Sequence, residues 1–214
     1  MKTQVDKINH KTPSPGIIYK AARIIKFGGL VAFPTDTVYG IGADVFNDEA
    51  VEKIYKVKRR TLHKPLQILV AQKSDLKNIT DNWSDLLETL VSKFWPGALT
   101  IVMKAKADFP SRVRCGLDTV GVRMPDNKIA LELINACEGP IAASSANISE
   151  HPDAKSAHEV LDYMDGKVDL LIDGGDTPGS TPSTVVNISI SPPAVLREGG
   201  LDIEKLSDIL WRAK

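Results

Sequence analysis

The stretch LVAFPTDTVYGIG, residues 30–42, joins an apolar run to a polar segment that ends in two glycines. The apolar run from Leu30 to Phe33 predicts a short buried strand, which Pro34 ends. Hydroxyls and exposed backbone N–H groups at the carboxyl end of a strand suit a small polar substrate. The polar segment therefore indicates a ligand site, although an ordinary turn with capping hydroxyls would have the same residue types.

Helix and strand patterns alternate on both sides of this stretch. A wide apolar stripe follows Ser14-Pro15 and ends at Gly28-Gly29, which predicts the first helix. Further helices are predicted at residues 48–58, 84–94, 128–137, 156–164 and 203–212. Further strands are predicted at residues 66–71, 99–103, 120–124, 141–143, 168–172, 184–188 and 194–196. This interspersion favours an α/β fold with a mixed, twisted sheet flanked by helices.

Composition favours a single domain over residues 1–214 and weighs against several classes of protein. The chain has 214 residues, of which 43% are apolar, so it can bury a substantial core. Lysine plus arginine equals aspartate plus glutamate, at 27 each, so no global field would hold RNA or an acidic membrane. Two cysteines and a polar opening give neither a disulfide framework nor a secretory signal. No apolar run approaches the roughly 20 residues of a membrane span, and we expect a cytoplasmic protein with no membrane segment.

A cationic cluster occupies residues 53–64, which include no acidic residue. Its members are Lys53, Lys56, Lys58, Arg59, Arg60 and Lys64. At a predicted helix end they would focus positive charge suited to a triphosphate, although a solvated helix face would have the same composition. The usual nucleotide signatures are missing, because there is no P-loop and Gly40-Ile-Gly42 lacks the third glycine of a dinucleotide fingerprint. ATP would therefore bind by another route.

Two further segments place polar groups beside apolar strands. Residues 143–149, ASSANIS, are small and rich in hydroxyls, which suits contact with phosphate or ribose, and a capping loop is the alternative. Arg123 lies inside an apolar run, where an arginine is costly unless an anion or an acid meets it. Ser183, Thr184 and Arg197 are weaker candidates when they are taken one by one.

Taken together and in this order, these segments resemble the YrdC-like family of threonylcarbamoyl-AMP synthases. The family's PTDTVYGLG segment is matched by residues 34–42, its KxR motif by residues 58–60 and its SxN motif by residues 145–147. Its STV and LRxG segments are matched by residues 183–185 and 196–199. The resemblance covers a core of about residues 17–200, and we expect no additional C-terminal domain of the kind that longer relatives carry.

The resemblance implies a YrdC-like twisted mixed sheet with a large positively charged cavity. It implies an L-threonylcarbamoyladenylate synthase, a nucleotidyltransferase that joins ATP, L-threonine and bicarbonate and releases pyrophosphate, normally with Mg²⁺. The product would feed threonylcarbamoyladenosine modification of tRNA through a tRNA threonylcarbamoyl transferase complex. Weak binding of RNA by the chain itself would be compatible with that role.

The resemblance also assigns the residues of the site. Threonine would be bound by Thr37, Arg123 and Ser183, and ATP by Arg60, Lys64, Thr119, Ser145, Asn147 and Arg197. Lys58 and Arg60 would be catalytic, with Mg²⁺ bound mainly through the ATP phosphates. Because these two residues lie at the end of a cationic helix, we expect both side chains to face solvent. Arg59 and Glu150 stand where the family frequently has glycine.

Two other functions compete with this interpretation. The first is a non-catalytic RNA-binding module of the same fold, which would use the cationic cluster. Zero net charge and 6% aromatic residues weigh against it, since nucleic-acid surfaces usually need a basic stripe and stacking platforms. The second is carbamoyl transfer to another protein, as in hydrogenase-maturation enzymes that contain a similar domain. Those enzymes also need acylphosphatase-like and zinc-finger regions, which do not fit a chain with two cysteines.

Overall fold

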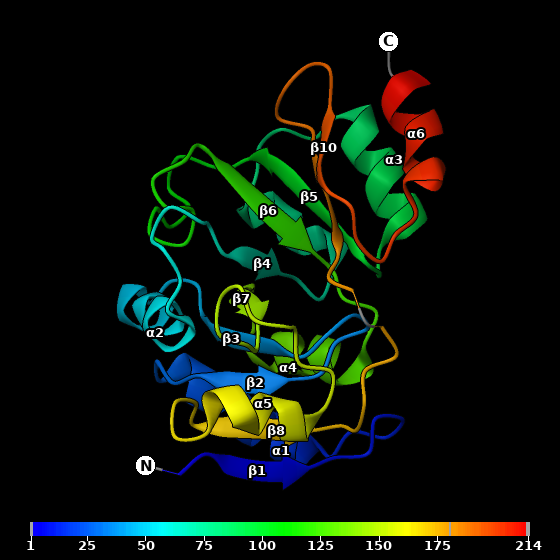
Figure 1. Ribbon diagram of the computed structural model, residues 1–214. Coiled ribbons are helices and arrows are strands. Elements are labelled where there is room, and N and C mark those ends of the chain that lie inside the picture. The colour runs from blue at the N-terminus through cyan, green and yellow to red at the C-terminus, as the bar shows by residue number, and fades with distance from the viewer. Residues whose placement is uncertain (1, 180, 213–214) are drawn as a thin grey trace.

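The strands predicted from the apolar runs pair into one mixed sheet (Figure 1). The computed structural model describes residues 2–179 and 181–212, and within them the sheet has ten strands in the order β1-β8-β2-β3-β7-β4-β6-β5-β9-β10. Four neighbouring pairs are parallel and five are antiparallel. The strands are β1 (Gln4–Lys7), β2 (Val31–Phe33), β3 (Gly40–Asp44), β4 (Gln67–Leu69), β5 (Leu99–Lys104), β6 (Thr119–Arg123), β7 (Ile141–Ser145), β8 (Leu170–Asp173), β9 (Thr184–Asn187) and β10 (Ala194–Arg197).

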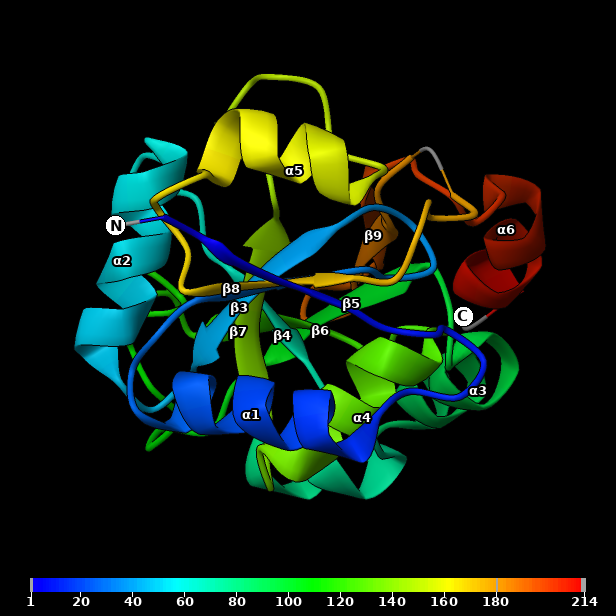
Figure 2. The same ribbon diagram turned by 90° about the horizontal axis from the view of Figure 1, so that it is seen from below.

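Helices cover both faces of this sheet. Figure 2 shows α1 (Pro15–Lys26) and α4 (Lys128–Ala136) on one side and α5 (Ala157–Met164) on the other. The remaining helices are α2 (Asp48–Lys58), α3 (Asp85–Phe94), α6 (Ile203–Arg212) and the 3₁₀ helix η1 (Lys73–Asn78). The fold class expected from the sequence is therefore confirmed.

Side-chain caps set the starts of several helices. Ser84, Asn127 and Ser156 each accept a hydrogen bond from the backbone N–H three residues later, as expected for N-cap residues. The capping box at α5 is only half formed, because Glu159 accepts from the backbone N–H of Lys155 and not from that of Ser156. Local polar residues thus fix where these helices begin.

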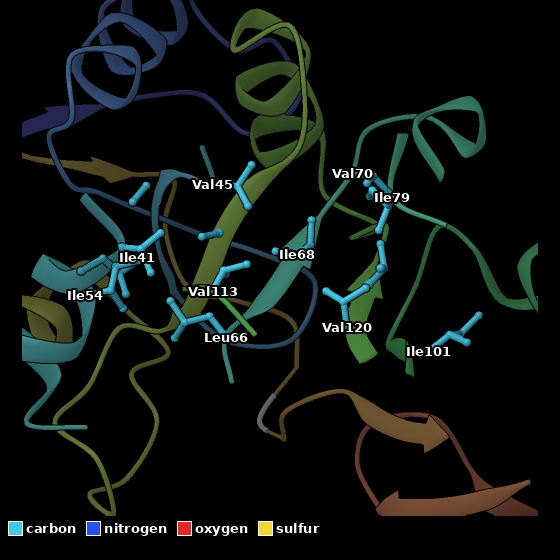
Figure 3. Close-up of a cluster of buried hydrophobic side chains, with 14 of the residues drawn as sticks. Ile41, Val45, Ile54, Leu66, Ile68, Val70, Ile79, Ile101, Val113 and Val120 are labelled. Atoms are coloured by element: carbon cyan, nitrogen blue, oxygen red, sulfur yellow. The ribbon is translucent and has the colours of Figure 1, made fainter. Parts of the chain in front are cut away.

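Two apolar clusters fill the space between the sheet and its helices. The larger one packs Ile68 of β4 and Ile101 of β5 together with residues of α2 and α3 (Figure 3). The smaller one includes Phe33 of β2 and Ile172 of β8, packed with residues of α1 and α4. Because side chains alternate between the faces of a strand, the other set of residues on β4, β5 and β6 points away from the larger cluster. That second set forms the floor of the site.

Three elements were not expected from the sequence. β3 lies inside the polar segment, where two glycines lowered its apparent strand propensity. Gly42 is needed for packing, since a Cβ on it would lie 2.8 Å from the ring of Phe33. β1 is a polar edge strand that pairs with β8, far along the chain, and η1 follows β4. None of the helices in residues 2–179 and 181–212 has the length and apolar character needed to cross a bilayer.

Candidate functional site

A cavity of about 540 Å³ lies over the middle strands of the sheet. Its floor consists of side chains at alternate positions of neighbouring strands, which share one face of the sheet. Loops before β3, after β7 and before β9 complete its walls. The floor residues are Gln67 and Leu69 of β4, Thr100 and Val102 of β5, Thr119, Gly121 and Arg123 of β6, Ala143 and Ser145 of β7, and Val185 and Asn187 of β9.

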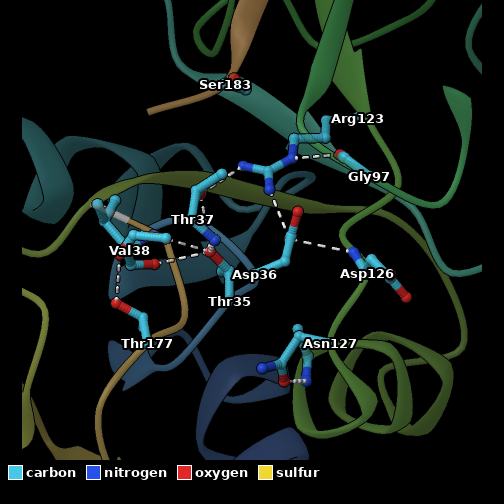
Figure 4. Close-up of polar contacts among 12 residues, drawn as sticks. Thr35, Asp36, Thr37, Val38, Gly97, Arg123, Asp126, Asn127, Thr177 and Ser183 are labelled. Carbon is cyan, nitrogen blue, oxygen red and sulfur yellow. Dashed lines mark hydrogen bonds and ion pairs between the residues drawn. The ribbon is translucent and has the colours of Figure 1, made fainter. Parts of the chain in front are cut away.

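Arg123 forms one corner of this cavity and is only 2% exposed (Figure 4). Its Nε donates to the carbonyl oxygen of Gly97 at 2.9 Å, and its Nη1 donates to Oγ1 of Thr37 at 2.9 Å. Its Nη2 pairs with the carboxylate of Asp36. Burial lowers the pKa of Arg123, while Asp36 opposes that shift. The acid that a buried strand arginine requires therefore comes from the polar segment.

Ser183 lies beside the same corner and belongs to a chain of hydroxyls. Its Oγ lies 2.7 Å from Oγ1 of Thr100, which is 3% exposed and donates to Oε1 of Gln67 at 3.2 Å. Arg197 donates to the carbonyl oxygen of Ser183 at 2.8 Å and to its Oγ at 3.3 Å. Our reading of the sequence did not identify Thr100 or Gln67. The signal that could have found them is a polar residue at an alternate position of an otherwise apolar strand.

A second cavity, of about 330 Å³, adjoins the first. Arg60, Ser145 and Asp153 line both cavities and so form the wall that they share. Arg60 is held in that wall because its Nε donates to the carbonyl oxygen of Lys64 and its Nη2 to that of Pro65. Burial lowers the pKa of Arg60. The KxR and SxN segments therefore meet here, as expected from their chemistry.

Lys58 lines the second cavity but does not face solvent. It is 1% exposed, and its Nζ donates to the carbonyl oxygens of Ser145 and Asn147 and to Oδ1 of Asn147, at 2.5, 2.8 and 2.9 Å. The expectation of a solvent-facing side chain is thus wrong for Lys58. The helix turns this side chain inward, where the SxN segment meets all three N–H groups. Burial, with a smaller contribution from Arg60, lowers the pKa of Lys58 to about 7, against the opposing effect of Asp153.

All ten residues assigned from the sequence line one or both cavities. The larger cavity has Thr37, Arg60, Thr119, Arg123, Ser145, Ser183 and Arg197 in its lining. The smaller one has Lys58, Arg60, Lys64, Ser145 and Asn147. Residues far apart in the sequence are thus brought together, although their roles toward threonine and ATP stay predictions.

The two residues that stand where the family frequently has glycine both have left-handed backbone conformations. Arg59, the C-cap residue of α2, has φ of 51°, and Glu150 has φ of 70°. Glycine is favoured in this region because it has no Cβ. The backbone shape that glycine favours is therefore kept by these residues at both positions, which preserves the turns beside the second cavity.

Known proteins match nearly the whole chain. Residues 23–199 match the Sua5/YciO/YrdC family, whose description reads "Telomere recombination". The threonylcarbamoyl-AMP synthases of Pyrococcus abyssi and Bacillus subtilis are 44% and 40% identical over 89% and 98% of this chain. The chain spans 56% and 62% of the length of these two relatives. The crystal structure of P. abyssi Sua5 complexed with L-threonine matches with a TM-score of 0.94 at 41% identity, covering 97% of this chain and 61% of that one.

Proposed function

Because the chain belongs to the Sua5/YciO/YrdC family, we propose that it is an L-threonylcarbamoyladenylate synthase. The observation that carries this proposal is the pair of adjoining cavities, one with a buried arginine beside hydroxyls and one lined by cations of the KxR segment. The first suits an amino acid and the second suits phosphates. Because the two cavities adjoin, an amino acid bound in the first would lie next to phosphates bound in the second.

The proposed reaction has two steps. The neutral amine of threonine combines with bicarbonate to give a carbamate and water. A carbamate oxygen then attacks the α-phosphorus of ATP, forming a new P–O bond while the bond to the leaving pyrophosphate breaks. Both partners of the second step are anions, so the site must supply positive charge at the phosphates and hold the carbamate in line.

Threonine would lie at the corner formed by Thr37, Arg123 and Ser183. Arg123 uses one N–H on each of Nε, Nη1 and Nη2 for the contacts described above, so one donor on each terminal nitrogen is left for the threonine carboxylate. Arginine is suited to such a carboxylate because its donors are planar and fixed. The P. abyssi relative, which was crystallised with L-threonine, supports an amino-acid substrate for this family.

ATP would lie across the shared wall, with its phosphates toward the second cavity. Arg60, Lys64, Ser145 and Asn147 would bind the triphosphate, and Thr119 and Arg197 would bind the rest of the nucleotide. Lys58 would act mainly by holding the SxN segment in place, because its three N–H groups already have acceptors there. We therefore propose that Arg60 makes the catalytic contact with phosphate.

Mg²⁺ would be held mainly by the ATP phosphates. The described residues include no group of three or more His, Cys, Asp or Glu that could bind a metal ion alone. Asp153 fits as a protein ligand, because it lines both cavities and makes no hydrogen bond or ion pair within residues 2–179 and 181–212. When bound, the ion would neutralise charge on the leaving pyrophosphate.

Delivery of the product to a tRNA threonylcarbamoyl transferase complex, and a cytoplasmic location, belong to the same proposal. The RNA-binding alternative has less support, since the relatives are named as synthases and the cationic residues Lys58 and Arg60 line a cavity. Zero net charge again weighs against a broad RNA surface.

The test is pyrophosphate release by the purified chain with ATP and Mg²⁺. We expect release only when threonine and bicarbonate are both present, and labelled bicarbonate should appear in a threonylcarbamoyl-adenylate product by mass spectrometry. Conversion of ATP without bicarbonate would contradict a carbamate nucleophile. No conversion with any amino acid, combined with binding of tRNA, would favour the RNA-binding module.

A further inference from the structure

Gln67 stands in the centre of the cavity floor. On β4 it is aligned with Gly121 of β6 on one side and with Ala143 of β7 on the other. Neither neighbour has a polar side chain. Among these three aligned residues, Gln67 therefore supplies the polar side-chain group. It lines the cavity and is partly exposed to it.

The rows on either side of Gln67 belong to the two halves of the proposed site. Leu69, two residues later on β4, is aligned with Arg123 of the amino-acid corner. In the other direction along β4, Pro65 accepts a hydrogen bond from Arg60. Ser145 of β7 and Thr119 of β6 lie on that same side of Gln67. Two residues of a strand span about 6.6 Å. Gln67 therefore lies between two parts of the site, each about one such step away. One is the corner formed by Thr37, Arg123 and Ser183, the amino-acid corner, and the other is the wall that the two cavities share, the phosphate wall.

The orientation of the carboxamide is set by a chain of hydrogen bonds. Arginine can only donate, so Arg197 donates to Oγ of Ser183. The hydroxyl of Thr100 gives its one hydrogen to Oε1 of Gln67, so in the 2.7 Å contact between the two hydroxyls Ser183 donates to Thr100. The opposite direction would leave the oxygens of Thr100 and Gln67 facing each other at 3.2 Å with no hydrogen between them. This direction commits the amide oxygen and leaves both N–H groups of Nε2 for the cavity.

Gly121 makes the link between Gln67 and Thr100 sterically possible. β6 lies between β4 and β5, so the two side chains must meet across it. A Cβ on Gly121 would lie 3.2 Å from Cγ2 of Thr100, which is a tight contact. With glycine there, Gln67 reaches Thr100 over the backbone of β6. The hydrogen bond between them thus depends on a residue without a side chain.

We propose that the carboxamide of Gln67 binds the one-carbon unit, donating from Nε2 to an oxygen of bicarbonate and then of the carbamate. This inference rests on the proposed function. The one-carbon unit joins the threonine amine to the α-phosphorus, so it must lie between the amino-acid corner and the phosphate wall. A neutral donor suits it, because a carboxylate at this position would repel the anion. Thr100 is a positioning residue, since it acts by fixing the amide.

The experiment measures pyrophosphate release against bicarbonate concentration at saturating threonine and ATP in CO₂-depleted buffer. In Gln67→Met, which removes both donors at similar length, we expect the KM for bicarbonate to rise about 10- to 100-fold. The KM values for threonine and ATP should stay within about threefold. Thr100→Val should shift the bicarbonate KM in the same direction by a smaller factor, because the amide remains but is free to turn. The matched controls are Gln4→Met at an exposed position of β1 and Thr89→Val at a partly exposed position of α3, where the hydroxyl donates only to its own helix, at the carbonyl oxygen of Asp85.

Binding of threonine alone, measured by titration calorimetry, should be the same in Gln67→Met and the wild type. If Gln67→Met does not fold, Gln67→Asn withdraws the amide from the cavity centre and should raise the bicarbonate KM likewise. An unchanged bicarbonate KM, or equal rises in all three KM values, would overturn the role of Gln67 while the wild-type reaction still supports the synthase. A wild type that releases no pyrophosphate would overturn the proposed function and this inference with it.

Discussion

Replacing Lys58 by methionine tests how the SxN segment is held. Methionine keeps the length of the buried side chain but removes its N–H donors, which number three in the ammonium and two in the neutral amine. The carbonyl oxygen of Asn147 then loses its Lys58 donor, while Oδ1 of Asn147 still accepts from Oγ of Ser145 at 2.7 Å. A buried acceptor without a partner costs about 1–3 kcal/mol. The variant should therefore be measurably less stable than the wild type, unlike a change at a solvent-facing lysine.

The size of this destabilisation should depend on pH. The pKa of Lys58 is lowered from 10.5 to about 7 in the folded protein. Between these two values the unfolded chain holds a proton that the folded chain has released. The free energy of unfolding of the wild type should therefore rise with pH there, by up to about 1.4 kcal/mol per pH unit from this group. The methionine variant lacks this contribution, so its deficit should grow by about 2–3 kcal/mol from pH 7 to pH 9.

Urea unfolding of both proteins at several pH values between 6 and 9 measures this difference. Lys56→Met is the matched control, because Lys56 lies exposed on the same helix and its ion pair with Glu52 is long, at 3.9 Å. Pyrophosphate release should fall together with stability, since a loosened SxN segment no longer lines the second cavity, where we propose that the phosphates bind. Parallel stability profiles for wild type and variant would refute the argument from burial. Lost activity with unchanged stability would instead return Lys58 to direct contact with phosphate.

Three further substitutions follow from the contacts of the site. Arg123→Ala should raise the KM for threonine more than that for ATP, and urea unfolding should show a loss of about 3–5 kcal/mol, because Asp36 is left without its buried partner. Arg60→Ala should lower the rate of pyrophosphate release about 10- to 150-fold while the unfolding free energy falls by only about 1–2 kcal/mol. Arg59→Gly should raise the melting temperature, since relief of its left-handed strain outweighs the added chain entropy by up to about 1 kcal/mol.

Local signals allowed most helices to be predicted from the sequence. The range of α2 was predicted as Asp48 to about Lys58, which agrees with the structure, and Ser84 and Ser156 were identified as residues where helices start. Each of these signals acts over three or four residues, so it can be read without knowledge of the fold. The fold class followed in the same way from the alternation of helix and strand patterns.

The features that were not predicted depend on contacts between residues far apart in the sequence. β1 is polar and gains its strand conformation by pairing with β8, about 165 residues away. Lys58 looked like a solvated residue because its neighbours in sequence are cations, yet its acceptors lie almost 90 residues later. The carboxylate partner of Arg123 was likewise supplied by a distant segment. Contacts of this kind depend on the order of strands in the sheet, which the sequence pattern alone does not give.

That strand order also explains how a chain of zero net charge gathers three arginines at one cavity. Arg60, Arg123 and Arg197 come from three separate segments, and the mixed sheet brings all three to the wall of one cavity. Arg197, from the edge strand β10, donates to Ser183, whose hydroxyl leads on to Thr100 and Gln67. A residue assigned to the nucleotide thus also orders the centre of the cavity floor. The edge strand is therefore part of the site, because its arginine lines the cavity and holds Ser183, whose hydroxyl donates to Thr100.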